Sequence, residues 1–276
     1  MSPDVEPLAS ETLGVRSMAV RVGNVVIDPS ASLAPKRFGL PPHPKEWEAL
    51  VEASKRIVRA IEKADIIIIT HYHRDHYNPG WLYPYDVYDG KTLIIKDYKN
   101  NINVSQKIRA YKFLKALREK DLNVKIEIGD GKEFEGIKLS KPLIHGDPKL
   151  GYVLAVRIGG IVFSSDVQGG DEEAWSWFEP FELLLLDGPP IYLNKGDPEK
   201  FKEKLLKVRG RVIVDHHSAR QKDWRELLGV KEAYSDLLGV EERPLEALRK
   251  ELYEKYPVEE SWLKMKFSEA RKIYFS

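Results

Sequence analysis

The stretch from residue 66 to residue 80, IIIITHYHRDHYNPG, constrains this chain more than any other, because its most apolar run leads directly into a histidine cluster. Four consecutive β-branched residues predict a strand that is buried on both faces, from Asp65 to Thr70. Three histidines and one aspartate follow within six positions: His71, His73, Asp75 and His76. We therefore expect these four side chains at the C-terminal end of an interior strand, where the backbone is rigid.

A solvated turn would be the ordinary explanation for one histidine, but it does not account for how the others are distributed. Of the 7 histidines, only His43 lies outside three short segments, HYHRDH, IHGD and DHHS. Each segment follows a predicted strand or lies in a loop at a strand end, and so does Asp166. This placement favours a site that gathers imidazoles and carboxylates.

The absence of cysteine narrows the chemistry of such a site. With no thiolate in the chain, any metal must be held by imidazole and carboxylate, a ligand set that suits zinc and also iron(II) or manganese(II). A mixture of histidine and carboxylate leaves coordination positions for water. The pattern therefore indicates an open, catalytic site and not a closed structural one.

Alternating strand and helix patterns predict an α/β fold. A hairpin around Gly159-Gly160 would deliver Asp166 at the end of its second strand. The expected strands cover residues 17–22, 24–28, 65–70, 92–96, 124–128, 137–139, 152–157, 161–165, 181–187 and 212–214. The expected helices cover residues 45–63, 105–120, 172–177 and 198–207, and the tail from Asp223 is expected to be mostly helical.

The order of the motifs resembles the metallo-β-lactamase superfamily, over about residues 17–220. That family shows His-x-His-x-Asp-His after a buried strand, then a lone histidine, an aspartate after a hairpin strand and a late histidine. The residues of this sequence that match the motif are His71, His73, Asp75, His76, His145, Asp166 and His216. The sequence NVVIDP, ending at Asp28 and Pro29, is similar to the family's opening hairpin, with Ser30 in place of the usual glycine.

This resemblance implies an αββα four-layer sandwich, in which two mixed β-sheets pack face to face and helices cover the outer faces. Residues 1–276 would form a single domain, with its core at about 17–220 and a helical C-terminal extension, 221–276, packed on that core.

The resemblance also implies two divalent metal ions, zinc first, with iron or manganese as alternatives. His71, His73 and His145 would bind one ion, and Asp75, His76 and His216 the second. Asp166 would bridge the two. The segment DHHSAR resembles the ending of the transfer-RNA 3′-processing branch, which makes His216 the expected ligand and His217 a residue of the site wall. The sequence does not settle the choice, and His217 remains the alternative ligand.

A binuclear metal-dependent hydrolase that uses a metal-bridging hydroxide is the function this site implies. Asp75 would orient the hydroxide. His217, Tyr72 and Tyr77 are the local candidates to protonate the leaving group. We expect a small-molecule substrate, a small phosphodiester or a lactone.

Two other functions remain open at this point. A metal-dependent ribonuclease is the first, drawn from HHSAR and from the basic helix 105–120, whose Tyr111 and Phe113 also suit packing on a sheet. The large domain that some RNA-processing branches insert before the last histidine is absent from residues 167–215, so nucleic acid is not the favoured partner. The second is a non-hydrolytic protein, either an iron-binding redox protein or a ligand-binding one.

Composition adds weaker expectations. A net charge of +1 argues against a chain built to coat nucleic acid or an anionic membrane. The N-terminal residues lack a secretory pattern, so we expect a cytoplasmic protein without membrane contact; the oligomeric state stays open. Charged residues make up 32% of the chain, above the typical ~25%, which suits a thermophile's surface ion pairs.

Several single residues carry expectations of their own. His43 should begin the helix 45–63, with a role beside the site as the alternative. Asp187, at the end of the strand 181–187, should support a ligand or cap a loop. Arg220, Lys195 and Lys141 lie near predicted strand ends and could meet an anionic substrate, but we expect them at the solvated surface.

Overall fold

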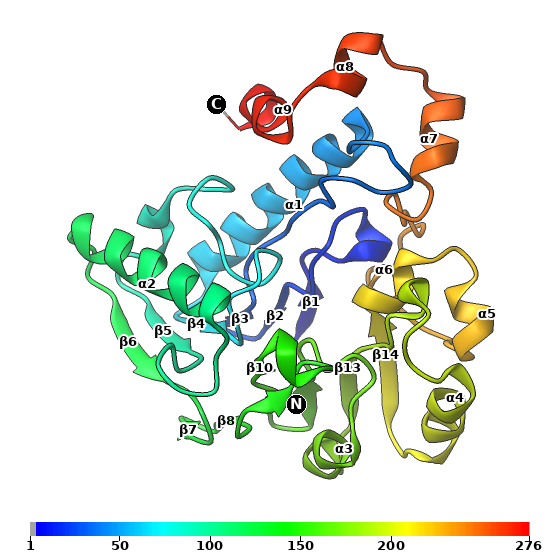
Figure 1. Cartoon of the computed structure of the whole chain (residues 1–276). Helices are drawn as coiled ribbons and strands as arrows, with labels where there is room; N and C mark the ends of the chain where they lie inside the picture. The colour runs from blue at the N-terminus through cyan, green and yellow to red at the C-terminus, as the bar shows by residue number, and fades with distance from the viewer. Residues whose placement is uncertain (1–3, 276) are drawn as a thin grey trace.

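Two six-stranded sheets form the centre of the protein, seen in a computed structural model that describes residues 4–275 (Figure 1). The first sheet has the order β1-β2-β3-β4-β5-β6. Its first three strands are antiparallel to one another, and β3 to β6 run parallel. The strands are β1 (Val5–Pro7), β2 (Val20–Val22), β3 (Val25–Ile27), β4 (Ile66–Ile69), β5 (Thr92–Ile95) and β6 (Lys125–Ile128).

The second sheet has the order β14-β13-β12-β11-β8-β7 and is also mixed. Strands β7, β8, β11 and β12 pair antiparallel, whereas β12, β13 and β14 run parallel. Its strands are β7 (Glu133–Phe134), β8 (Ile137–Leu139), β11 (Val156–Ile158), β12 (Ile161–Phe163), β13 (Leu183–Asp187) and β14 (Arg211–Asp215). A separate two-stranded ladder joins β9 (Leu143–Ile144) to β10 (Tyr152–Val153).

The isoleucines of β4 show how the sheets are layered, because successive strand side chains point to opposite faces. Ile66 and Ile68 belong to the core between the sheets, with Phe163 of β12 on the facing sheet. Ile67 and Ile69 belong to the core beneath the helices. A strand covered on both faces needs apolar residues at every position, which explains the unbroken run.

Helices cover both outer faces, so the predicted αββα sandwich is confirmed. Helices α1 (Pro44–Lys63) and α2 (Val104–Glu119) share a buried cluster with β4 and β5 of the first sheet. Helices α3 (Glu172–Phe178), α4 (Pro198–Lys207) and α5 (Trp224–Leu228) share another with β12, β13 and β14 of the second. No helix in the described part of the chain is long and apolar enough to cross a membrane.

The C-terminal residues pack against both sheets and α1. They form α6 (Tyr234–Leu238), α7 (Arg249–Lys255), α8 (Glu260–Lys264) and α9 (Phe267–Tyr274). Tyr234 is fully buried in the core between the sheets. Helix α9 lies over α1 in Figure 1, where the ring of Phe267 is 4.8 Å from that of Trp47.

Some expected strands differ from the observed ones. The expected strand 152–157 divides into β10 and β11, because Leu154 N–H donates to the carbonyl of Thr70 at 3.2 Å and so leaves both ladders. The expected strand 17–22 begins only at Val20, since Ser17 bonds to the loop at Ser30 instead. Short strands β1 and β7 were not predicted; two or three residues carry too little alternation to indicate a strand.

Candidate metal centre

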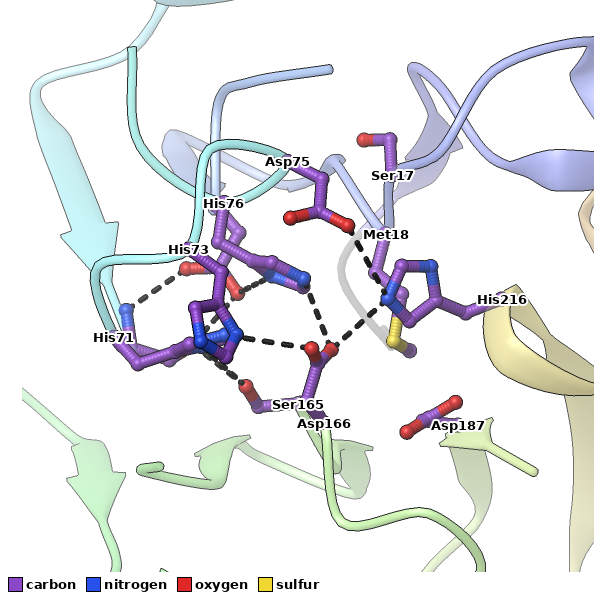
Figure 2. Close-up of polar contacts among 12 residues, drawn as sticks. Ser17, Met18, His71, His73, Asp75, His76, Ser165, Asp166, Asp187 and His216 are labelled. Carbon is purple, nitrogen blue, oxygen red and sulfur yellow. Dashed lines mark hydrogen bonds and ion pairs between the residues drawn. The ribbon is translucent and has the colours of Figure 1, made fainter. Parts of the chain in front are cut away.

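The predicted site residues come together where strands of both sheets end. His71 and the motif after it follow β4, Asp166 follows β12, and His216 follows β14. Figure 2 shows their side chains converging on the carboxylate of Asp166 from both sheets. Loops after parallel strands lie at the same edge of a sheet, which is why segments distant in sequence meet here.

A first group faces one oxygen of Asp166. The rings of His71, His73 and His145 have centroids 4.8 to 5.2 Å apart. Asp166 Oδ2 lies 3.0 Å from His145 Nε2 and 3.4 Å from His71 Nε2. One potential ligand atom from each of these four residues lies within 4.8 Å of the others.

A second group faces the other oxygen. Asp166 Oδ1 lies 2.9 Å from His76 Nε2 and 3.1 Å from His216 Nε2. The carboxylate of Asp75 completes this group, with Oδ2 3.8 Å from His216 Nε2. Two groups on opposite oxygens of one carboxylate are consistent with a binuclear metal site.

The donor atoms themselves fit a metal better than they fit a hydrogen-bond network. His71 Nε2, His76 Nε2 and Asp166 Oδ1 are buried and make no hydrogen bond of acceptable geometry. Buried polar atoms are nearly always paired, so each such atom requires an explanation. Cations between the imidazoles and the carboxylate would satisfy all three atoms.

Acidic residues behind the imidazoles fix how the rings point. Asp28 Oδ2 lies 2.8 Å from His76 Nδ1, and Asp28 in turn accepts hydrogen bonds from Thr70. Glu11 Oε2 lies 2.8 Å from His216 Nδ1. A carboxylate on Nδ1 leaves Nε2 directed at the centre, the usual support of a metal-binding histidine.

Glu11 also holds an arginine beside the site. Its Oε1 accepts a hydrogen bond of 2.7 Å from Arg220 Nε, and Arg220 Nη2 lies 3.6 Å from Asp75 Oδ2. Arg220 is only 3% exposed, so the expectation of a solvated side chain is wrong. Its charge is tolerated in the interior because Glu11 and Asp75 surround it.

The pKa values of imidazoles shift in opposite directions in the two groups. Burial lowers the pKa of His71 to about 4 and that of His73 to about 2, and neighbouring imidazoles add to the effect. Burial acts the same way on His76, but Asp166 and Asp28 outweigh it and raise its pKa to about 10. The pKa of Asp166 is held well below its ordinary value, since His76 and His216 overcome its burial. The carboxylate at the centre therefore stays ionised.

His217 differs from His216 in its contacts. Its Nδ1 lies 3.0 Å from both oxygens of Asp187, which also accepts its backbone N–H. Burial raises the pKa of Asp187 and lowers that of His217. Asp187 thus supports His217, in the manner expected of a carboxylate at this strand end. His217 also approaches Asp166 closely enough to count with it and His216 as a possible ligand group.

Backbone strain gathers at the same strand ends. Asp28, Ser165 and His216 have φ angles of 49°, 55° and 64°, in the left-handed region that non-glycine residues rarely adopt. Each follows the last residues of a strand that leads into the site. Strained residues of this kind cluster where a structure must aim a functional group.

The remaining candidates lie away from the cluster. Tyr72 is buried and donates to the carbonyl of Lys96, and Tyr77 packs on Phe113 beneath the helices. Lys195 and Lys141 are exposed, as expected. His43 caps α1, accepting from the backbone N–H of Lys45, which agrees with its expected place at the helix start.

Sequence reasoning missed Glu11. It lies in the short 3-10 helix η1 (Glu11–Leu13), before the expected core, and meets His216 across 205 positions. No local pattern marks it. Asp28 was noticed only as the end of an opening hairpin, and its contact with His76 follows from the pairing of β3 with β4.

The fold and this arrangement of histidines and aspartates define a class of proteins. A family model described as "Beta-lactamase superfamily domain" matches residues 23–192, and the chain belongs to that superfamily. The resemblance inferred from the motifs is thereby confirmed.

Individual proteins with similar sequences or structures were also found. A UPF0282 protein of Sulfurisphaera tokodaii is 41% identical, in a match that covers 91% of this chain and 93% of the relative. A UPF0282 protein of Korarchaeum cryptofilum is 39% identical, covering 92% and 96%. Among solved structures, a diphosphatase from the PhnP family is 17% identical with a TM-score of 0.46, covering 78% of this chain and 86% of that one.

Proposed function

We propose that this protein is a binuclear metal-dependent hydrolase whose preferred substrate is a small phosphodiester or a lactone. The observation that carries the proposal is the position of Asp166, with one oxygen facing His71 and His145 and the other facing His76 and His216. A carboxylate shared between two imidazole groups is an arrangement that suits two divalent ions. Zinc is the first choice for this ligand set, followed by iron and manganese.

Each residue has a proposed task. His71, His73 and His145 would hold one ion, Asp75, His76 and His216 the other, and Asp166 would bridge them. When bound, the ions would supply an activated water and take up negative charge on the substrate. Asp75 is held near Arg220, 3.6 Å away, and would orient the attacking water.

His217 is the proposed proton donor to the leaving group. The other two candidates point beneath the helices: Tyr72 donates its hydroxyl to the carbonyl of Lys96, and Tyr77 packs on Phe113. The contact with Asp187 holds Nδ1 of His217 and leaves Nε2 free. Because burial lowers the pKa of His217, its imidazole would first accept a proton from the attacking water and then pass it to the leaving group.

The test combines metal analysis with hydrolysis. Purified protein would be reconstituted separately with zinc, manganese and iron, then assayed on bis(p-nitrophenyl) phosphate, lactones and thioesters. We expect about two ions per chain and activity on one substrate class. His73→Ala should lose both, whereas His43→Asn should keep both, because asparagine also caps a helix and His43 lies outside the cluster. Protein that binds no transition metal, with unchanged His73→Ala, would refute the proposal.

A ribonuclease is the second candidate, favoured by the position of α2. Gln106 of this helix approaches His73, with 3.4 Å between their Nε2 atoms, and Tyr111 on the same helix is 44% exposed. Phe113, by contrast, is buried, as the packing explanation expected. RNA cleavage that continues in EDTA would exclude a metal-dependent nuclease. Bound iron whose colour bleaches on reduction, without any hydrolysis, would instead favour the redox class.

A further inference from the structure

A cavity of about 600 Å³ lies beside the candidate metal centre, and Arg220 borders both. Four separate segments line the cavity: the turn at Arg37 and Phe38, residue Tyr192, residues 220–223, and helix α7 with the residues just before it. The C-terminal segment therefore builds one wall of a space next to the site.

Positive charge in this cavity is only partly neutralised. Four cationic side chains line it, together with the acidic Asp223 and Glu251: Arg37, Arg220, Lys222 and Lys250. Arg220 is paired with Glu11, and Lys222 with Glu251. Asp223 is exposed and accepts a hydrogen bond from Gln221.

Arg37 has only a distant carboxylate that it shares with Arg16, and Lys250 has none among residues 4–275. The nearest carboxylate to Arg37 is that of Glu246, at 3.9 Å, and both oxygens of Glu246 already accept from Arg16 at 2.6 Å. Arg37 Nε is buried without a hydrogen bond. Lys250 makes no ion pair with any residue from 4 to 275. Two cations are thus held at one cavity without a carboxylate of their own.

An unusual turn positions them. The Arg37 guanidinium lies between two rings, 4.6 Å from the centroid of Phe38 and 4.8 Å from that of Tyr192. The ammonium of Lys250 lies 5.1 Å from the Phe38 centroid. Phe38 and Gly39 have φ angles of 54° and 81° between the paired residues 37 and 40. Such a turn favours asparagine, aspartate or glycine, yet it carries a phenylalanine that is 44% exposed.

We infer that this cavity binds an anionic group of the substrate, a carboxylate or a phosphate, separate from the group cleaved at the metal centre. The position assigned to that group rests on the proposed function. A guanidinium and an ammonium both form charge-assisted hydrogen bonds to oxyanions. The Arg37 guanidinium, fixed between two rings and bonded to the carbonyl of Arg220, does so at little cost in ordering, whereas the exposed Lys250 adds charge at the rim. The substrate would then be a phosphodiester or a lactone that carries a further anionic group, apart from the bond that is cleaved.

Binding to metal-free protein tests the cavity without any catalysis. Inorganic phosphate and glutarate would each be titrated calorimetrically into wild type, Lys250→Met and Lys255→Met at low salt. Lys255 is the matched control: it is on the same helix, 5.4 Å from the ring of Tyr256, and does not line this cavity. We expect at least one probe to bind, and Lys250→Met to weaken it about tenfold. No binding of either probe, or equal binding by wild type and Lys250→Met, would overturn the inference.

Hydrolysis of matched esters then separates the cavity from the metal chemistry. Propyl p-nitrophenyl phosphate carries one negative charge, and its 2-carboxyethyl and 2-phosphonoethyl counterparts carry more. We expect a lower KM for the carboxyethyl or the phosphonoethyl ester than for the propyl ester. Lys250→Met should raise that lower KM about tenfold and leave kcat unchanged. Equal KM values for all three esters would refute the substrate class. Probe binding that depends on Lys250, without cleavage of any ester, would uphold the cavity and contradict the proposed function.

Discussion

Replacing Arg249 by methionine tests how the C-terminal segment is fixed to the body of the protein. Arg249 of α7 and Glu46 of α1 are 0% and 1% exposed. Arg249 Nε and Nη2 donate to the Glu46 carboxylate at 2.8 and 2.7 Å. The same guanidinium donates to the carbonyls of Leu40 and Ala34, at 3.1 Å each.

The expected loss is large because the partners stay buried. Removing one member of a buried ion pair costs about 3–5 kcal/mol. In this variant the carboxylate of Glu46 would keep only the backbone N–H of His43, at 2.8 Å. Burial already raises the pKa of Glu46, and Arg249 opposes that rise. Without Arg249 the folded pKa rises further above its unfolded value, so the loss should shrink as pH falls toward 4.5.

Urea unfolding followed by circular dichroism at pH 7 and pH 5 measures both effects. Arg243→Met is the matched control, since Arg243 also reaches α1, 3.4 Å from Glu52, but both side chains are about half exposed. An exposed pair contributes about 0–1 kcal/mol. The double variant Glu46→Leu/Arg249→Met should recover part of the loss. A loss for Arg249→Met no greater than for Arg243→Met, or one independent of pH, would refute this reasoning.

Three further predictions concern the site and its surroundings. Zinc or manganese at a hundred times Kd should stabilise dialysed protein by about 2.7 kcal/mol in thermal unfolding, and Asp166→Asn should abolish most of this gain. Asp28→Asn should weaken metal binding about 10–100-fold in competition with a chromophoric chelator; unchanged affinity would mean that Asp28 does not orient His76. Against burial, Arg16 lowers the pKa of Glu246 to about 2. The Glu246 carboxylate therefore contributes about 3 kcal/mol to the free energy of unfolding above pH 4.5, and this contribution is lost as the pH falls toward 2. Glu246→Gln should remove this part of the pH dependence of the free energy of unfolding measured in urea.

Much of the fold follows from the sequence because hydrophobic periodicity is local. Helix α1 and strand β4 lie within a residue of their expected bounds. The motif after β4 indicated a site by its own spacing, and the family resemblance supplied the rest of the ligand candidates, which the structure brings to the same edge of the sheets. Glu11 could not, because its partner His216 is brought to it only by tertiary packing. Arg220 was assigned to the surface for the same reason: a charge becomes tolerable inside only when an unseen carboxylate faces it.

The backbone and the donor atoms together argue against a purely structural histidine cluster. Holding Asp28, Ser165 and His216 in left-handed conformations costs about 1–3 kcal/mol each. Burying imidazole nitrogens and a carboxylate oxygen without hydrogen bonds adds a further penalty. A cluster needed only for packing would be replaced by apolar side chains at a gain in stability, since well-packed apolar groups outperform buried charges. The protein instead tolerates both costs together where strands of both sheets end, which is expected when the donor atoms serve a ligand that relieves them.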